Sequence, residues 1–197
     1  MNTSVCSIGN MRFRELKFLI KSDLYRYIGK ISISLIIKTW LYDPGFKYTF
    51  WMRICKFLRQ TALFKYSIYR IAILFLNHYK YKYGISIPFM TKIGSGFYIG
   101  HFGCIVVNPN AIIGDNCNIS HGVTIGQSNR GQRKGYPTIG NNVYIAPGAK
   151  IIGNIKIGNN VAIGANCVVT NDIPDDAVAV GIPARVISYK GSLECNR

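Results

Sequence analysis

Aliphatic residues recur every six positions through most of the second half of the chain. In the clearest run, each is followed four positions later by a second small or branched residue. A period of six fits neither the 3.6-residue repeat of an α-helix nor the two-residue alternation of an ordinary strand. It is typical of a chain that takes a short extended step, turns and repeats, with one aliphatic side chain per step entering a narrow interior. The positions are Ile139, Ile145, Ile151, Ile157, Ile163 and Val169.

The same period begins before this run, slips by two residues between Ile105 and Val107, and continues to Ile125. Gly and Asn at the corners, as in Gly140-Asn141-Asn142, tolerate the left-handed backbone conformations that tight turns use. Three steps close one triangular coil, and successive coils stack as parallel strands about 4.8 Å apart. The predicted fold class is therefore mainly β, a left-handed parallel β-helix of hexapeptide repeats over residues 85–187.

A polar segment, residues 127–138, interrupts the repeat between Ile125 and Ile139. It is rich in glycine and contains three Lys or Arg residues. Long loops on a rigid scaffold often contain binding residues. We expect a projecting loop that contributes to a site, and a tolerated surface insertion is the alternative.

Residues 1–84 follow a different pattern and are expected to form a separate α-helical region. Apolar residues such as Phe13, Leu16 and Ile20 stand at helical spacing, and Asp43-Pro44-Gly45 predicts a break between two helices. The region contains fifteen Lys or Arg residues against three Asp or Glu, and eighteen of the twenty-five aromatic residues of the chain. Most of the net charge of +16 therefore lies before the β-helix.

Two interpretations of this basic, aromatic region stay open. Lys and Arg mixed with Trp, Tyr and Phe suit a helix that lies in the headgroup region of a membrane. The same aromatic residues equally suit packing against the β-helix and contacts between subunits. A sequence pI of 9.8 also suggests nucleic-acid binding as a third interpretation. No RNP, KH or zinc-finger pattern occurs, however, so no nucleic-acid partner is expected.

The cysteines and the longest apolar runs limit the cellular setting. The six cysteines include no C-x-x-C pair and no spacing with histidine that suits zinc, so no metal site is predicted. No secretory signal pattern opens the chain, and no apolar run approaches the roughly 20 residues that span a bilayer. We expect a reduced, cytoplasmic protein, placed at the inner face of the cytoplasmic membrane if the N-terminal region binds lipid. The segment 188–197 is expected to be a C-terminal tail.

Two of the three histidines are predicted to lie together. His101 follows the interior position Ile99 by two residues, and His121 follows Ile119 in the same way. The two anchors are one coil apart, so both imidazoles are expected on the same face of neighbouring coils. A neutral imidazole can take the proton of an alcohol as the oxygen attacks an acyl carbonyl. No G-x-S-x-G pattern provides a serine nucleophile, so direct transfer to a hydroxyl is the simplest chemistry.

Five stretches of the repeat carry further motifs: Ile99-Gly100-His101 with Ile105-Val106-Val107, Ile113-Gly114-Asp115-Asn116, Ser120 to Gly126, Ala146 to Asn154, and Val180 to Ile187. Through these stretches, residues 84–187 resemble the serine acetyltransferase branch of the hexapeptide-repeat acyltransferases. The resemblance covers just over half of the chain.

The resemblance implies a trimeric β-helix with acetyl-CoA as acetyl donor and no metal. It places His101 at the catalytic general base of the family, with His121 and Tyr136 as further candidate catalytic residues. It also implies a set of residues that line the CoA cleft. That set is Gly126, Ala146, Ala165, Thr170, Asn171 and Arg185.

Two departures from the family pattern decide the expected acceptor. The Asp that precedes the catalytic histidine in serine acetyltransferases is Gly100 here, and a second histidine before a proline is Tyr136. We therefore expect a sugar hydroxyl as acceptor, in the biosynthesis of a surface polysaccharide such as capsule, O-antigen or exopolysaccharide. The alternative is serine O-acetylation in cysteine biosynthesis. A third hypothesis is a scaffold that keeps the β-helix and has no enzymatic activity.

Overall fold

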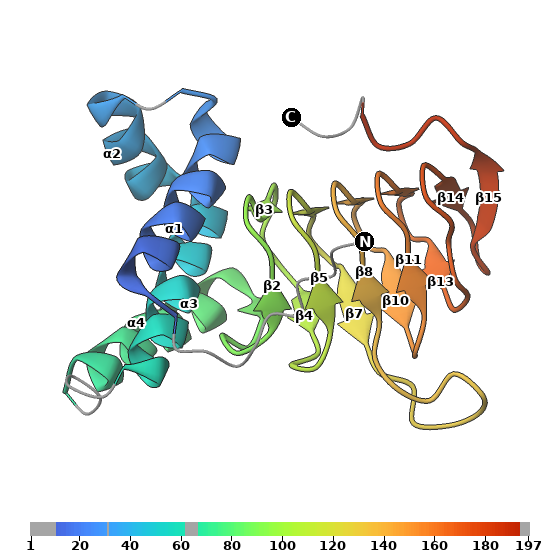
Figure 1. Ribbon diagram of the computed structural model, residues 1–197, viewed down its shortest axis with the longest axis horizontal. Coiled ribbons are helices and arrows are strands. Elements are labelled where there is room, and N and C mark those ends of the chain that lie inside the picture. The colour runs from blue at the N-terminus through green and yellow to red at the C-terminus, as the bar shows by residue number, and fades with distance from the viewer. Residues whose placement is uncertain (1–10, 31, 62–66, 194–197) are drawn as a thin grey trace.

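The computed structural model describes residues 11–30, 32–61 and 67–193, and it joins a helical N-terminal part to a β-helix (Figure 1). Within these ranges the N-terminal part contains four helices. Pro44 is the first residue of the third helix, where its fixed φ suits a helix start, so the predicted break at Asp43 is confirmed. The helices are α1 (Phe13–Ile28), α2 (Ile33–Tyr42), α3 (Pro44–Gln60) and α4 (Ser67–Tyr83).

Short strands of two to four residues form the three sides of the β-helix. Sheet 1 contains β1 (Ile85–Ser86), β4 (Ile105–Val107), β7 (Thr124–Gly126), β10 (Lys150–Ile152) and β13 (Val168–Val169). Sheet 2 contains β2 (Lys92–Ile93), β5 (Ile112–Ile113), β8 (Thr138–Ile139) and β11 (Lys156–Ile157). Sheet 3 contains β3 (Tyr98–Ile99), β6 (Asn118–Ile119), β9 (Tyr144–Ile145), β12 (Ala162–Ile163), β14 (Val178–Val180) and β15 (Arg185–Ser188).

Strand pairing confirms the parallel β-helix. All named strand pairs are parallel except β14 with β15, where the chain turns back at the C-terminal end. This arrangement of stacked parallel sheets fits the expected left-handed β-helix. The expectation of a mainly β chain, however, understated the helices, since each described helix has 10 to 17 residues and each strand no more than four.

The aliphatic positions of the hexad pattern form the interior of the coil. Each is at most 7% exposed, including Ile93, Ile119, Ile151 and Val169. The second positions of the hexads, such as Val143 and Cys167, are also buried. Full burial of one such side chain contributes about 1.5–3 kcal/mol, so the regular stack of aliphatic side chains is the main source of stability for this half.

The two-residue slip in the repeat lies in the turn that contains His101. Tyr98 pairs with Asn118, and Val106 pairs with Thr124, so the turn after β3 is two residues longer than the turn after β6. Both Ile105 and the next alternate residue of β4 point into the core. The sequence placed the slip between these two interior residues, whereas the extra length belongs to the exposed turn 100–104.

The helical part is fixed to the first coil of the β-helix by buried polar contacts. Arg53 on α3 and Asp23 on α1 are both 1% exposed and form an ion pair, with Nε 3.0 Å from Oδ2. Arg53 also donates to the carbonyl of Ile93 at 2.9 Å, and Asp23 accepts from the backbone N–H of Phe97 at 2.8 Å. Gly45 lies where a Cβ would stand 2.5 Å from a coil carbonyl, which explains a glycine at the start of α3.

None of the described helices is both long enough and apolar enough to cross a bilayer.

Candidate active site

The two histidines lie together on one edge of the β-helix, where the chain passes from sheet 3 to sheet 1. We call the turns 100–104, 120–123, 146–149 and 164–167 the histidine edge. Ile99 pairs with Ile119, and the His101 and His121 ring centroids are 6.0 Å apart with the planes at 73°. Both residues are exposed. The register therefore places two exposed imidazoles side by side on one edge of the coil.

Stacked turns hold the histidines at fixed positions. The N–H of Gly122 donates to the carbonyl of Gly103 at 2.8 Å, and the N–H of Gly148 donates to the carbonyl of His121 at 2.9 Å. The amine of Lys150, on β10, reaches the carbonyl of Gly122. These bonds fix the backbone of the edge, while neither imidazole has a hydrogen-bond partner among the residues that the structure describes.

Gly100 leaves His101 without a carboxylate on the preceding residue, and a side chain at this position would crowd Tyr98. A Cβ at this position would stand 3.2 Å from the ring of Tyr98. That ring is itself packed against Tyr27 of α1, with centroids 4.5 Å apart. An aspartate at position 100 would therefore require the Tyr98 ring to shift.

The candidate CoA residues form two groups. Ala146 and Ala165 lie on the histidine edge, and Arg185 lies on β15 at the C-terminal end of sheet 3. The side chains of Ala165 and Arg185 are exposed, and Arg185 has no ion pair with any described residue. A free guanidinium beside an edge of small side chains fits a phosphate-bearing ligand such as CoA.

The second group lies on another edge, where the chain passes from sheet 1 to sheet 2. Gly126 ends β7 there, and Thr170 and Asn171 follow β13. The loop that precedes Thr138 leaves the coil at this edge and projects from it (Figure 1). Ser128 and Gly135 pair across the loop at its base.

Tyr136 lies at the end of this loop and is 38% exposed. It belongs to the edge between sheets 1 and 2, whereas His101 and His121 belong to the histidine edge. The fold of a single chain therefore brings the two histidines together but places Tyr136 on a different edge.

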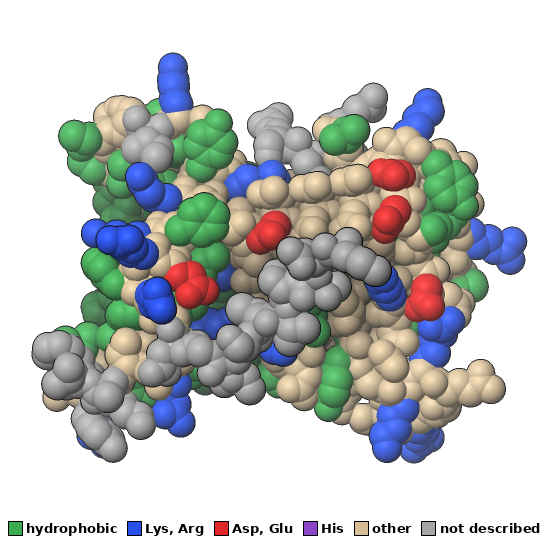
Figure 2. Space-filling view, in the orientation of Figure 1, with side chains coloured by type: hydrophobic (Ala, Val, Ile, Leu, Met, Phe, Trp, Pro, Cys, Tyr) green, Lys and Arg blue, Asp and Glu red, His purple; other side chains and the backbone are tan. Residues whose placement is uncertain are grey.

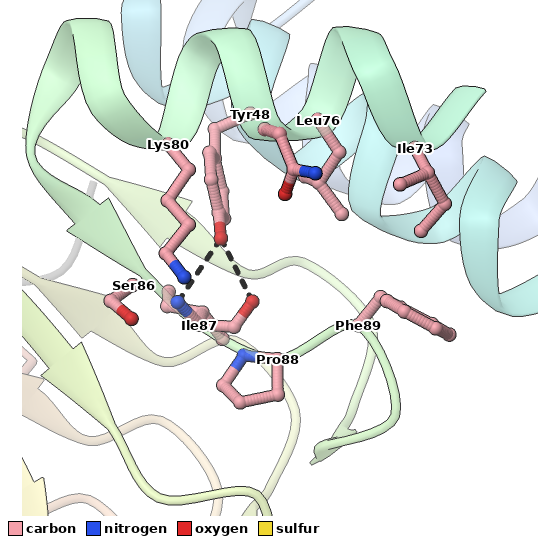
Figure 3. Close-up of a pocket in the computed structure, with 9 residues that line it drawn as sticks. Tyr48, Ile73, Leu76, Lys80, Ser86, Ile87, Pro88 and Phe89 are labelled. Carbon is pink, nitrogen blue, oxygen red and sulfur yellow. Dashed lines mark hydrogen bonds between the residues drawn. The ribbon is translucent and has the colours of Figure 1, made fainter. Parts of the chain in front are cut away.

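A cavity beside the first strand of sheet 1 was not expected from the sequence (Figure 3). It has a volume of about 210 Å³ and lies between α3, α4 and the segment 86–89. Its polar groups are the amine of Lys80, the amide of Asn77 and the hydroxyl of Ser86. The Tyr48 hydroxyl donates to the carbonyl of Ile87 at 2.8 Å and accepts from its N–H at 3.1 Å, which closes one side.

Helix α4, which lines this cavity, ends at the His101 turn. Tyr83, the last residue of α4, contacts the ring of Phe102 at 5.3 Å between centroids. The N–H of Ile105 donates to the carbonyl of Gly84 at 3.0 Å, directly beneath the turn. The helix that contributes Lys80 to the cavity therefore ends against the residues that hold His101. No sequence pattern marks Lys80. It is distinguished only by its position three residues before the end of α4, which packs on this turn.

The described cysteines differ in exposure, and none of them joins a metal-ligating cluster. No group of three or more His, Cys, Asp or Glu in the described part of the chain could hold a metal ion. Burial raises the pKa of the Cys55 and Cys117 thiols to about 12, which disfavours the reactive thiolate. Cys104 is exposed in the His101 turn. The other two cysteines, Cys6 and Cys195, lie outside the described residues.

Comparisons with known proteins identify the type of fold and the relatives. Residues 136–171 match the family "Bacterial transferase hexapeptide (six repeats)". A serine acetyltransferase of Synechococcus elongatus is 45% identical over 108 residues, which cover 55% of this chain and 44% of that protein. The matched segment thus spans under half of the length of this relative.

Solved structures extend the likeness into the helical part. The soybean serine acetyltransferase apoenzyme is 31% identical, with a TM-score of 0.72, and the match covers 87% of this chain and 69% of that one. A serine acetyltransferase from Brucella abortus in complex with coenzyme A is 28% identical, with a TM-score of 0.75, covering 91% of this chain and 70% of that one.

These comparisons overturn the expected saccharide acceptor. The relatives at 44–45% identity are named serine acetyltransferases, and the solved structures carry the same name. The expectation of polysaccharide biosynthesis rested on Gly100 and Tyr136 alone, and those two positions do not outweigh the likeness of the whole coil. The prediction of a sugar hydroxyl is therefore wrong, and its alternative has the support.

Proposed function

We propose, from the premise that the chain belongs to the serine acetyltransferase family of hexapeptide-repeat transferases, that it transfers an acetyl group from acetyl-CoA to the hydroxyl of L-serine. The observation that carries the proposal is the pairing of His101 with His121 on an edge that continues into Ala146 and Ala165. A base and a groove for the donor then lie on one continuous surface.

His101 acts in this proposal as the general base. Its imidazole takes the proton of the serine hydroxyl while the oxygen attacks the thioester carbonyl. The tetrahedral intermediate then collapses and the carbon–sulfur bond breaks. The CoA thiolate that leaves accepts the proton from the imidazolium, which restores the neutral imidazole. His121, in contact with His101, orients the base or the acceptor.

The donor binds along the histidine edge in this scheme. Ala146 and Ala165 leave room for the pantetheine arm, and Arg185 pairs with a phosphate of CoA. Gly126, Thr170 and Asn171 lie on the neighbouring edge, as does Tyr136. We include a homotrimer in the proposal, because a neighbouring copy would bring that edge to the histidines, which one chain alone does not.

The direct test is thiol release from acetyl-CoA by the purified protein. We expect release with L-serine and none with a panel of free sugars, nucleotide sugars and polysaccharide. Mass spectrometry of the product should show O-acetylserine. Release with a saccharide and not with serine would contradict the proposal, and failure to bind CoA by calorimetry would contradict the donor as well.

Lys80 is the cation that we assign to the serine carboxylate. Its amine lines the cavity beside the segment 86–89 (Figure 3), on the helix that ends against the His101 turn, and it forms no ion pair with a described acidic residue. A hydrogen bond to a charged group contributes about 1.5–3 kcal/mol. Lys80→Met should therefore raise the KM for serine by about tenfold or more, with the KM for acetyl-CoA unchanged.

Lys82→Met is the matched control for this variant, because Lys82 is exposed on the same helix and does not line the cavity. Ethanolamine, which lacks the carboxylate, provides the second arm. The parent enzyme should use ethanolamine poorly, and Lys80→Met should use it as poorly as the parent does. An unchanged KM for serine in Lys80→Met would remove Lys80 from the site while leaving the acetyl transfer intact.

A further inference from the structure

The outward face of α2 is apolar although nothing in the described chain covers it. Ile33, Ile37 and Leu41 follow one another at i, i+4 and i+8, so they form one stripe along the helix. They are 80%, 55% and 56% exposed. We call this stripe the α2 face.

The opposite side of α2 already packs against the protein. Thr39 is 3% exposed, and Trp40 contacts Phe46 and Phe50 of α3 with centroids 6.3 and 4.8 Å apart. The helix thus packs on α3 with one side and presents an apolar stripe on its exposed side, beside Ser34 and Lys38, its single charged residue. An exposed apolar stripe of this length is typical of a surface that an apolar medium covers.

The charges around the α2 face indicate which medium. Lys30, three residues before Ile33, and Lys38, on α2 itself, are exposed. Of the three acidic residues in the helical part, Asp23 is buried against Arg53 and Asp43 is half-buried. Figure 2 shows Lys and Arg side chains interspersed with apolar ones over the helical end of the molecule.

We infer that the α2 face docks on the surface of an anionic lipid bilayer, with Ile33, Ile37 and Leu41 in the headgroup boundary and the neighbouring lysines on the phosphates. Apolar residues flanked by basic ones are the composition of helices that lie in the membrane interface. The place of α2 agrees, since it packs on α1 and α3 at the end of the molecule away from β15 (Figure 1). The inference does not depend on the acceptor of the enzyme.

Co-sedimentation with lipid vesicles tests this assignment on the full chain. The parent protein should bind vesicles that contain phosphatidylglycerol and not vesicles of phosphatidylcholine alone, and salt should weaken the binding. Ile37→Ser/Leu41→Ser should lower the bound fraction by at least about tenfold, since each substitution removes a large apolar side chain from the lipid. Lys30→Glu/Lys38→Glu should do the same while keeping the apolar stripe.

The matched control is Ile187→Ser/Tyr189→Ser, which removes two equally exposed apolar residues at the other end of the molecule. It should bind vesicles like the parent. Equal binding by the α2 variants and the parent would overturn the inference, as would no binding by the parent. A smaller assembly of the α2 variants in analytical ultracentrifugation, without vesicle binding by the parent, would show instead that a second copy covers the α2 face.

Discussion

Replacing His101 with alanine is expected to lower the kcat of acetyl transfer by about 10²- to 10⁴-fold, the contribution typical of a positioned general base. In our proposal this imidazole takes the hydroxyl proton. Its removal should leave the fold intact, because the side chain is exposed and lies in a turn held by backbone bonds through Gly103 and Gly122. Thiol release measures the rate, and calorimetry with CoA measures donor binding, which should be retained.

Two further histidine variants make this result specific. His78 lies exposed on α4, so His78→Ala should keep the parent rate. His121→Ala should slow the reaction, and the double variant His101→Ala/His121→Ala should be little slower than His101→Ala alone if the two imidazoles act as a unit. A His101→Ala protein with most of its activity would show that His101 is not the base.

The orientation of His101 is the feature in which this chain departs most from the family pattern. The residue before it has no side chain, and a Cβ there would stand 3.2 Å from the Tyr98 ring. The neighbour of the His101 ring is His121, at 6.0 Å between centroids. The structure thus places a second imidazole beside His101.

The interior of the β-helix could be predicted almost residue by residue. A side chain in a narrow coil has one way to point, so the six-residue spacing of Ile145, Ile151 and Ile157 fixes both the strands and their pairing. The pairing of Ile99 with Ile119 then follows from counting, and with it the meeting of the two histidines. In a coil of this kind, the spacing along the sequence alone determines which residues are neighbours in space.

The helical part and the cavity could not be predicted in this way. Helix spacing shows that α1 and α3 form, but their packing depends on which side chains meet, such as Arg53 with Asp23. The position of the slip was also ambiguous, because Ile105 fits the repeat before it and after it. Lys80 became a candidate only when the end of α4 was seen to pack on the His101 turn.

The error over the acceptor has a related cause. Gly100 and Tyr136 were judged as isolated departures, without the positions around them. Within one chain Tyr136 does not lie on the histidine edge, so its identity bears on what His101 deprotonates only through a neighbouring copy. In our proposal the acceptor is recognised by Lys80 of α4, a residue that no motif marks.

The largest stability effect is expected at Arg53. Removing its guanidinium by Arg53→Met leaves Asp23 buried without its ion-pair partner, and breaking such a pair typically costs about 3–5 kcal/mol. The carbonyls of Ile93 and Gly94 lose their donors at the same time. Burial already raises the pKa of Asp23 against the opposing effect of Arg53, so without Arg53 the carboxyl should take up a proton more readily. The free energy of unfolding in urea, at fixed protein concentration, measures the loss.

Arg59→Met provides the control, because Arg59 is exposed on the same helix and exposed substitutions usually change stability by no more than about 0.5 kcal/mol. The double variant Asp23→Leu/Arg53→Met should recover part of the loss, since no uncompensated charge remains. Recovery should stay incomplete, because the N–H of Phe97 loses its acceptor. A cost below about 1 kcal/mol for Arg53→Met would mean that the helical part is fixed to the first coil mainly by its apolar contacts, with the α1–α3 ion pair contributing little.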